Sequence, residues 1–159
     1  MLEAVDRIHW HSYPQPSSDQ QAVPNALRAL AFDPAEGDSQ RTYVALLDAV
    51  GRNHAGTYYP VVVPTIPFLG EIIEDGSARA RRNALEVLVD LAWSFEPEPG
   101  FEMVDGGIGN TVELRAAVRS ATAKLSDIIQ RAAVRPENDP AMKQTAQQLL
   151  VLLAKWGLL

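Results

Sequence analysis

The chain of 159 residues contains no cysteine. This absence excludes a disulfide scaffold, a metal site built on thiolates and a thiol nucleophile, and it favours a cytoplasmic protein. The first residues, Met1–Arg7, are charged and are not followed by the apolar run of a secretory signal. No stretch approaches the roughly 20 apolar residues that cross a bilayer. We therefore expect a protein that does not associate with membranes.

Aromatic residues are also scarce, at 7%, although 47% of the chain is hydrophobic. A chain rich in alanine and leucine and poor in aromatic residues favours helices packed on helices over sheets. The length suits one continuous core. The sequence thus predicts an all-α fold in a single domain covering residues 1–159.

Apolar residues recur at helical spacing in six segments that proline and glycine separate. The predicted helices are residues 24–32, 39–54, 65–75, a helix capped by Ser77 that runs to Phe95, a long helix from Leu114 to Pro136, and a last one after Asp139. The third helix is expected to be kinked or delayed by Pro60, Pro64 and Pro67. Residues 1–23 are predicted to form an arm, residues 96–111 an irregular inserted loop, and no sheet is expected. Leu88 and Leu149 are predicted core residues.

One internal repeat is visible. Leu69–Ile73 and Leu125–Ile129 share the order apolar, small, acidic, Ile, Ile, and Leu27–Leu30 is a looser third copy. Self-similarity at a period of roughly 40 to 47 residues is typical of solenoids built from helix pairs. The sequence predicts a short α-solenoid of about three stacked helix pairs, with an irregular helical bundle as the alternative.

The stretch His54-Ala-Gly-Thr-Tyr-Tyr-Pro60, followed by Pro64 and by Pro67-Phe-Leu69, resembles the signature of bacterial HEAT-repeat-like proteins. In that family a His-x-Gly-Thr-x-Tyr-Pro turn leads into a Pro-Phe-Leu helix. Val23-Pro24-x-x-Leu27 and Arg41 fit the same pattern, and the resemblance covers about residues 23–92. It implies a HEAT-like fold and an interaction module, in some cases similar to immunity partners of bacterial toxins. It implies no catalytic residue.

Histidines are too few and too scattered to predict a metal site or a general base. His9 and His11 alternate along the chain, no further ligand follows them at metal-binding spacing, and His54 has no evident catalytic partner. We interpret the first two as packing residues and His54 as a helix-terminal residue. We therefore expect no metal, no cofactor and no catalytic residue.

The glycine-rich stretch Asp105-Gly-Gly-Ile-Gly-Asn110 lacks the Lys and Ser or Thr of a phosphate loop and the acid spacing of a calcium loop, so a flexible connector is expected. Two arginine groups occur, Arg79 with Arg81 and Arg82, and Arg115 with Arg119. We interpret both as solvated faces. A formal net charge of −6 opposes a broad phosphate-binding surface, so no nucleic acid is expected. A HEAT-like enzyme acting on nucleic acid or a chromophore is the alternative from another class.

Positively charged residues are missing from a long part of the chain. Residues 83–114, the acidic segment, contain no Lys, Arg or His, and their seven carboxylates are Glu86, Asp90, Glu96, Glu98, Glu102, Asp105 and Glu113. Aromatic side chains lie among them, and such a combination favours a protein-docking surface. The alternative is a solubilising loop with its aromatic residues in the core.

We predict from these patterns a non-enzymatic protein–protein interaction module with a basic protein partner. Its sharpest form is an immunity-type inhibitor of a basic toxin, and a purely structural adaptor is a further alternative. The predicted partner-binding residues are Glu96, Glu98, Phe101, Glu102 and Asp105.

Overall fold

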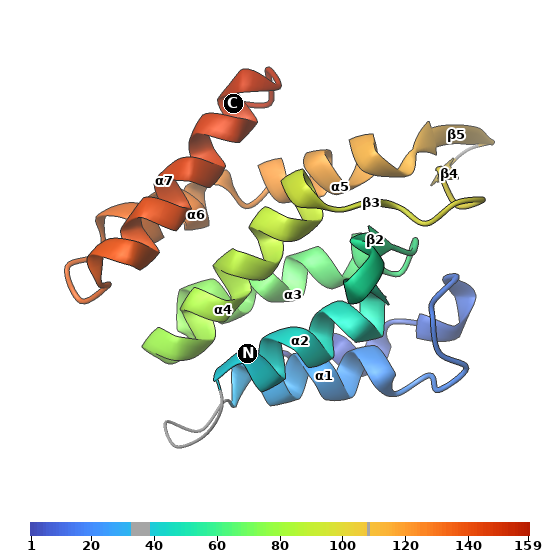
Figure 1. Cartoon of the computed structure of the whole chain (residues 1–159), viewed down its shortest axis with the longest axis horizontal. Helices are drawn as coiled ribbons and strands as arrows, with labels where there is room; N and C mark the ends of the chain where they lie inside the picture. Colours follow the sequence, from blue (N-terminus) through green and yellow to red (C-terminus); the bar gives the residue numbers. More distant parts are fainter. Residues whose placement is uncertain (33–38, 108) are drawn as a thin grey trace.

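The computed structural model describes residues 1–32, 39–107 and 109–159. In this part of the chain the fold is mostly helical, with seven α-helices and five short strands (Figure 1). The helices are α1 (Ala22–Ala31), α2 (Ser39–Val50), α3 (Val62–Asp75), α4 (Ala78–Val89), α5 (Leu114–Ala123), α6 (Ser126–Val134) and α7 (Pro140–Lys155). The strands are β1 (Gly51–Arg52), β2 (Thr57–Tyr58), β3 (Glu96–Pro97), β4 (Met103–Gly107) and β5 (Asn110–Glu113).

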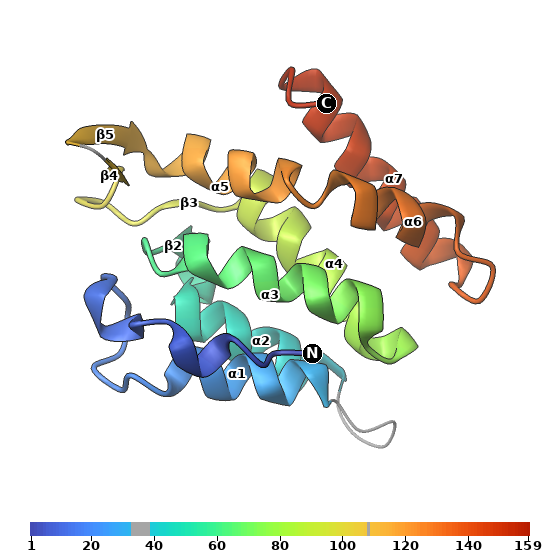
Figure 2. The same cartoon turned by 180° about the vertical axis from the view of Figure 1, so that it is seen from behind.

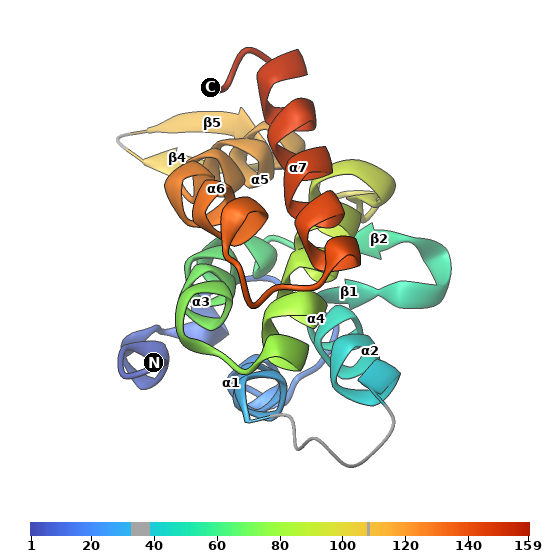
Figure 3. The ribbon, with the colours of Figure 1, turned by 90° about the vertical axis from the view of Figure 1, so that its left-hand side faces the viewer.

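Helices that are neighbours in sequence pack as pairs: α1 with α2, α3 with α4, and α6 with α7. Helix α3 also contacts α1, α5 and α6, and α4 contacts α2 and α7. Seen end-on, α1, α3 and α6 therefore form one layer, and α2, α4 and α7 form the other (Figure 3). One hydrophobic cluster runs between the layers, and it contains the predicted core residues Leu88 and Leu149, both 0% exposed.

The two copies of the predicted repeat lie against each other. Leu69–Ile73 belongs to α3, and Leu125–Ile129 leads into α6. Gly70 permits their close approach, because a Cβ atom built there would lie 2.6 Å from Cδ2 of Leu125 and 3.5 Å from Cδ1 of Ile128. The small residue in the pattern therefore has a packing role.

Three predicted helices differ from those observed. Helix α2 ends at Val50 rather than at residue 54, because strand β1 follows it directly and pairs with β2. Helix α3 begins at Val62, before the predicted start at residue 65, because Pro64 falls in the first turn, where backbone N–H groups have no partner within the helix. The predicted long helix from Leu114 is divided into α5 and α6. At the division the N–H of Leu125 donates to the carbonyl of Thr122 over 2.9 Å, a tightened turn that preserves the apolar spacing.

The predicted cap at Ser77 is confirmed, and the helix predicted after Asp139 has Asp139 itself as its cap. Ser77 accepts a hydrogen bond from the N–H of Ala80 at the start of α4, and Asp139 accepts one from Met142 at the start of α7. Helix α4 passes into a π-helical turn at Asp90–Ser94, so the helical backbone ends one residue before Phe95.

The N-terminal arm (residues 1–21) lies across α1 and α3 (Figure 2). It contains two short 3₁₀ turns, and the side chains of Leu2, Val5 and Trp10 are buried. The indole N–H of Trp10 donates to the carbonyl of Val5 over 2.8 Å, and its ring packs against Phe68. The arm is thus part of the core.

The expectation of no sheet is wrong. Strand β2 pairs with β1 in antiparallel and with β3 in parallel orientation, and β4 and β5 form a separate antiparallel hairpin. The strands are short and mostly polar, so the period of two that marks a strand is not developed in the sequence. No helix in the described ranges is both long and apolar enough to cross a membrane.

Candidate docking groove and the acidic segment

The turn at residues 51–60, called the motif turn, carries the resemblance to HEAT-like proteins. Gly56 has a positive φ of 64°, which favours glycine. At Gly51 a Cβ atom would lie 2.0 Å from the carbonyl oxygen of Thr57, so no larger residue fits without moving the backbone. These two glycines let β1 fold back onto β2.

The motif turn binds the first part of the inserted loop, residues 96–98, which we call the clamp strand. The N–H of Glu96 donates to the carbonyl of Gly56 over 2.9 Å, and the N–H of Glu98 donates to the carbonyl of Tyr58 over 2.8 Å. The prediction of an irregular loop is therefore wrong for this part. The backbone carbonyls of the motif turn therefore hold the clamp strand in place by hydrogen bonds.

Glu98 is buried, with 8% of the residue exposed. Its carboxylate accepts a hydrogen bond from Oγ1 of Thr57 over 2.5 Å and forms an ion pair with the guanidinium of Arg52 over 3.2 Å. The expectation that Glu98 is exposed is wrong, because its carboxylate is buried against Thr57 and Arg52.

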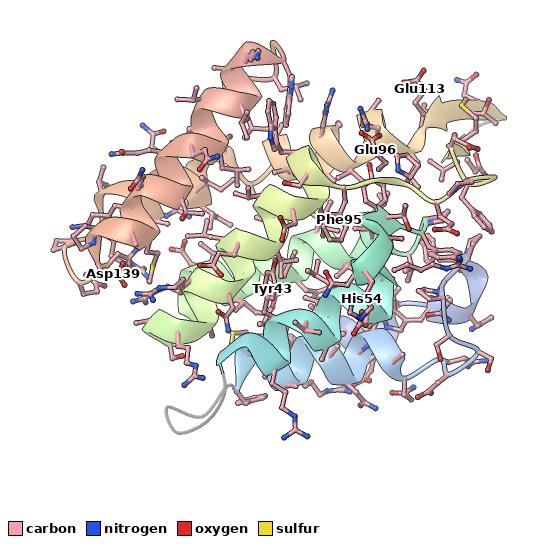
Figure 4. The ribbon with its side chains drawn as sticks, in the orientation of Figure 1. Tyr43, His54, Phe95, Glu96, Glu113 and Asp139 are labelled. Carbon is pink, nitrogen blue, oxygen red and sulfur yellow. The ribbon has the colours of Figure 1, made fainter. Side chains whose placement is uncertain are left out.

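Glu96 remains exposed but also has a cation beside it. Its carboxylate pairs with the guanidinium of Arg115 on α5 (Figure 4). The acidic segment has no cation of its own, yet the fold supplies one to each carboxylate of the clamp strand. Neither Arg52 nor Arg115 is near these acids in sequence.

The other predicted residues lie in or next to the β4–β5 hairpin. The ring of Phe101 packs against that of Tyr59, with centroids 5.0 Å apart, and so ties the base of the hairpin to the motif turn. Glu102 and Asp105 are exposed. The glycine-rich stretch is not a simple connector, since Asp105–Gly107 ends β4 and Asn110 begins β5. Ile108, at the centre of that stretch, lies outside the described residues.

Glu102 is held as a carboxylate by the backbone. It accepts the N–H of Gly100 over 3.0 Å, which lowers its pKa below the ordinary value. Among the described residues no Lys or Arg forms an ion pair with Glu102 or with Glu113, which lies at the end of β5 (Figure 4). The charges of Glu102 and Glu113 are therefore not neutralised by a described cation, unlike those of the clamp strand.

A groove of about 880 Å³ lies between the arm, the hairpin and α5. It contains two of the predicted residues, Phe101 and Asp105, and its hairpin side carries Met103 and Val112, which are 52% and 37% exposed. The remaining residues of the lining are Ser12, Tyr13, Pro14, Pro60, Val63, Val104, Gly106, Ala116, Ala117, Ser120, Ala121 and Lys124. Exposed apolar surface in a concave site is typical of binding surfaces.

The other candidates from the sequence do not converge on one place. The rings of His9 and His11 lie 5.8 Å apart in the arm, and His54 is exposed in the 3₁₀ turn Asn53–Ala55. In the described ranges no three His, Cys, Asp or Glu side chains gather closely enough to hold a metal ion. Arg82 pairs with Asp139, and Arg119 lies over the ring of Trp156 at 4.2 Å.

Two clusters were not predicted at all. The hydroxyl of Tyr43 on α2 donates to Asp90 beyond the end of α4, and burial together with this bond raises the pKa of the tyrosine. Trp93, 47% exposed, stacks on Trp156 with ring centroids 6.2 Å apart. Both contacts join residues that are distant in sequence, so no local sequence motif predicts them.

Comparison of the chain with family models, with curated proteins and with solved structures gives no match. We therefore infer function from the geometry of the side chains.

Proposed function

We propose that this protein is a non-enzymatic interaction module that binds a basic protein partner in the groove between the arm, the hairpin and α5. The observation that carries the proposal is the combination of exposed apolar side chains, Met103 and Val112, with the carboxylates of Glu102 and Glu113, which no described cation neutralises. Apolar contact supplies affinity, and unneutralised charge steers a basic partner into place.

The same proposal extends to the type of fold and to the compartment. The three helix pairs act as units of a short HEAT-like α-solenoid, and the contact of Gly70 with Leu125 between the repeat copies supports this interpretation. The lack of cysteine favours the cytoplasm. In its sharpest form, the module is an immunity-type inhibitor that covers the basic surface of a toxin.

The proposal can be tested with a defined probe, a fluorescein-labelled 16-residue amphipathic peptide rich in Leu and Arg. We expect saturable binding by fluorescence anisotropy, and NMR shift changes centred on Met103, Val112 and Ala117. Val112→Asp should weaken binding about tenfold or more, because it replaces an apolar contact with a carboxylate that binding would desolvate, and tenfold corresponds to about 1.4 kcal/mol.

Val151→Asp is the matched control, since Val151 is an exposed valine on α7, away from the groove. Both variants add one negative charge, so general attraction of the cationic peptide would strengthen both equally. Loss of binding in Val112→Asp alone supports the groove. Equal binding by the two variants would show that the peptide adheres elsewhere, and the proposed function would then fail.

A further inference from the structure

The groove is asymmetric in side-chain size. The face of α5 that borders it carries only small residues, Ala116, Ala117, Ser120 and Ala121, and ends at Lys124. The opposite walls carry the larger side chains of Met103 and Tyr13. A wall of small residues lets another backbone come close, and helices that pack in this way lie 8–10 Å apart.

The dimensions suit a helix. Helix α5 has 10 residues and is therefore about 15 Å long. A helix of the same length and roughly 10 Å in diameter occupies roughly 1,200 Å³. The groove, of about 880 Å³, is of the same order of size and is open to solvent on one side, so a helix bound in it keeps one face in solvent. An amphipathic helix suits that arrangement.

The charges at the two ends of the groove differ in sign. Asp105 lines the hairpin end; Glu113 is paired across the hairpin with Met103 of the lining, and Glu102 directly precedes Met103 in the chain. Lys124 lines the other end, where α5 terminates (Figure 1). A helix carries partial positive charge at its N-terminus and partial negative charge at its C-terminus. The groove therefore favours one direction of a bound helix.

We propose that the occupant is an amphipathic helix of about three turns that lies parallel to α5, with its N-terminus at the hairpin. Its large apolar residues, spaced i, i+4 and i+7, face Ala116, Ala117 and Ser120. Its Lys or Arg residues lie in or just before the first turn, where they meet the hairpin carboxylates. This inference rests on the proposed function and specifies the conformation and the direction of the partner.

The test uses three fluorescein-labelled probes of identical composition and the full-length protein. The forward probe has Arg in its first helical turn, the reversed probe has Arg in its last turn, and both have a lactam staple that fixes the helix. The third is an unstapled probe in which the apolar residues alternate, as in a strand. We expect the forward probe to bind about tenfold more tightly than either of the others.

Two variants localise the effect. Ala116→Trp should abolish the binding of the forward probe by filling the groove, whereas Gln147→Trp, at a position on α7 that is also exposed, should not change it. Lys124→Glu should remove the preference for the forward over the reversed probe. Circular dichroism and thermal unfolding of each variant confirm that it is folded.

The outcomes separate the two proposals. Tighter binding of the alternating probe in the groove overturns the helical occupant but leaves the proposed function intact. Equal affinity of the forward and reversed probes overturns the direction of binding. If none of the three binds, the groove does not accept basic amphipathic segments, and the proposed function fails with the inference.

Discussion

The clamp strand and the hairpin are neighbours in one acidic stretch, but their carboxylates lie in different surroundings. In the clamp strand, Glu96 pairs with Arg115, and Glu98 is buried against Thr57 and Arg52. In the hairpin region, Glu102 and Glu113 are exposed, and no described Lys or Arg forms an ion pair with them. A carboxylate that already has a cation beside it offers less charge to a partner, whereas an unpaired carboxylate in solvent is available to one. The number of acidic residues in a segment does not show which of its carboxylates are paired within the fold and which are not.

The largest effect is expected in the helical stack that supports both regions. Leu88 and Leu149 are fully buried, so replacing either by Ala removes apolar contacts and leaves a cavity. We expect each change to lower the free energy of unfolding by about 2 to 5 kcal/mol, measured by urea denaturation. A loss below about 0.5 kcal/mol at both positions would contradict the assignment of the core.

The clamp strand should give the next largest effect. Glu98→Ala removes a charge-assisted hydrogen bond to Thr57 and leaves the half-buried hydroxyl of Thr57 without that acceptor. We expect a loss of about 1 to 3 kcal/mol in the free energy of unfolding. Glu102→Ala is the matched control, because its carboxylate is exposed, and its effect should be much smaller. A similar loss in the free energy of unfolding for both variants would contradict the difference between the clamp strand and the hairpin.

A smaller effect concerns pH. The pKa of Glu102 is lowered chiefly by the N–H of Gly100, so its carboxylate stabilises the folded state above the pKa of the unfolded chain. This contribution is lost as the pH falls through the lowered pKa of the folded state. We expect a carboxyl-carbon NMR titration of Glu102 with a midpoint below the ordinary glutamate value of 4.5, accompanied by a shift of the Gly100 amide. A midpoint at or above 4.5 would contradict the hydrogen bond.

Helices could be predicted well where their signals are local. Ser77 caps α4 as predicted, α7 begins directly after Asp139 as predicted, and the burial of Leu88 and Leu149 follows from helical spacing. The division between α5 and α6 could not be predicted, because neither glycine nor proline marks it and a tightened turn keeps the apolar period.

The residues of the candidate site were predicted only in part, because some of their contacts come from segments that are distant in sequence. Phe101 and Asp105 line the groove, and both belong to the acidic segment, whose mixture of acidic and aromatic residues predicts a docking surface. Glu98 was misjudged because its partners, Thr57 and Arg52, come from the motif turn more than 40 residues away in the chain. Parallel pairing of β2 with β3 produces that contact, and two-residue strands have no sequence period to reveal it.

The central claim is that Glu102 and Glu113, unlike the two carboxylates of the clamp strand, are available for binding, and association kinetics test it most directly. Glu102→Gln with Glu113→Gln should be compared with Glu96→Gln with Glu98→Gln, using the stapled forward probe in stopped-flow fluorescence from low to high salt. We predict that the hairpin pair slows association and flattens its salt dependence, with less than about 0.5 kcal/mol change in stability at each position. The clamp-strand pair should leave the salt dependence close to that of the unmodified protein. If instead the clamp-strand pair flattens the salt dependence and the hairpin pair does not, the assignment of the two regions is wrong.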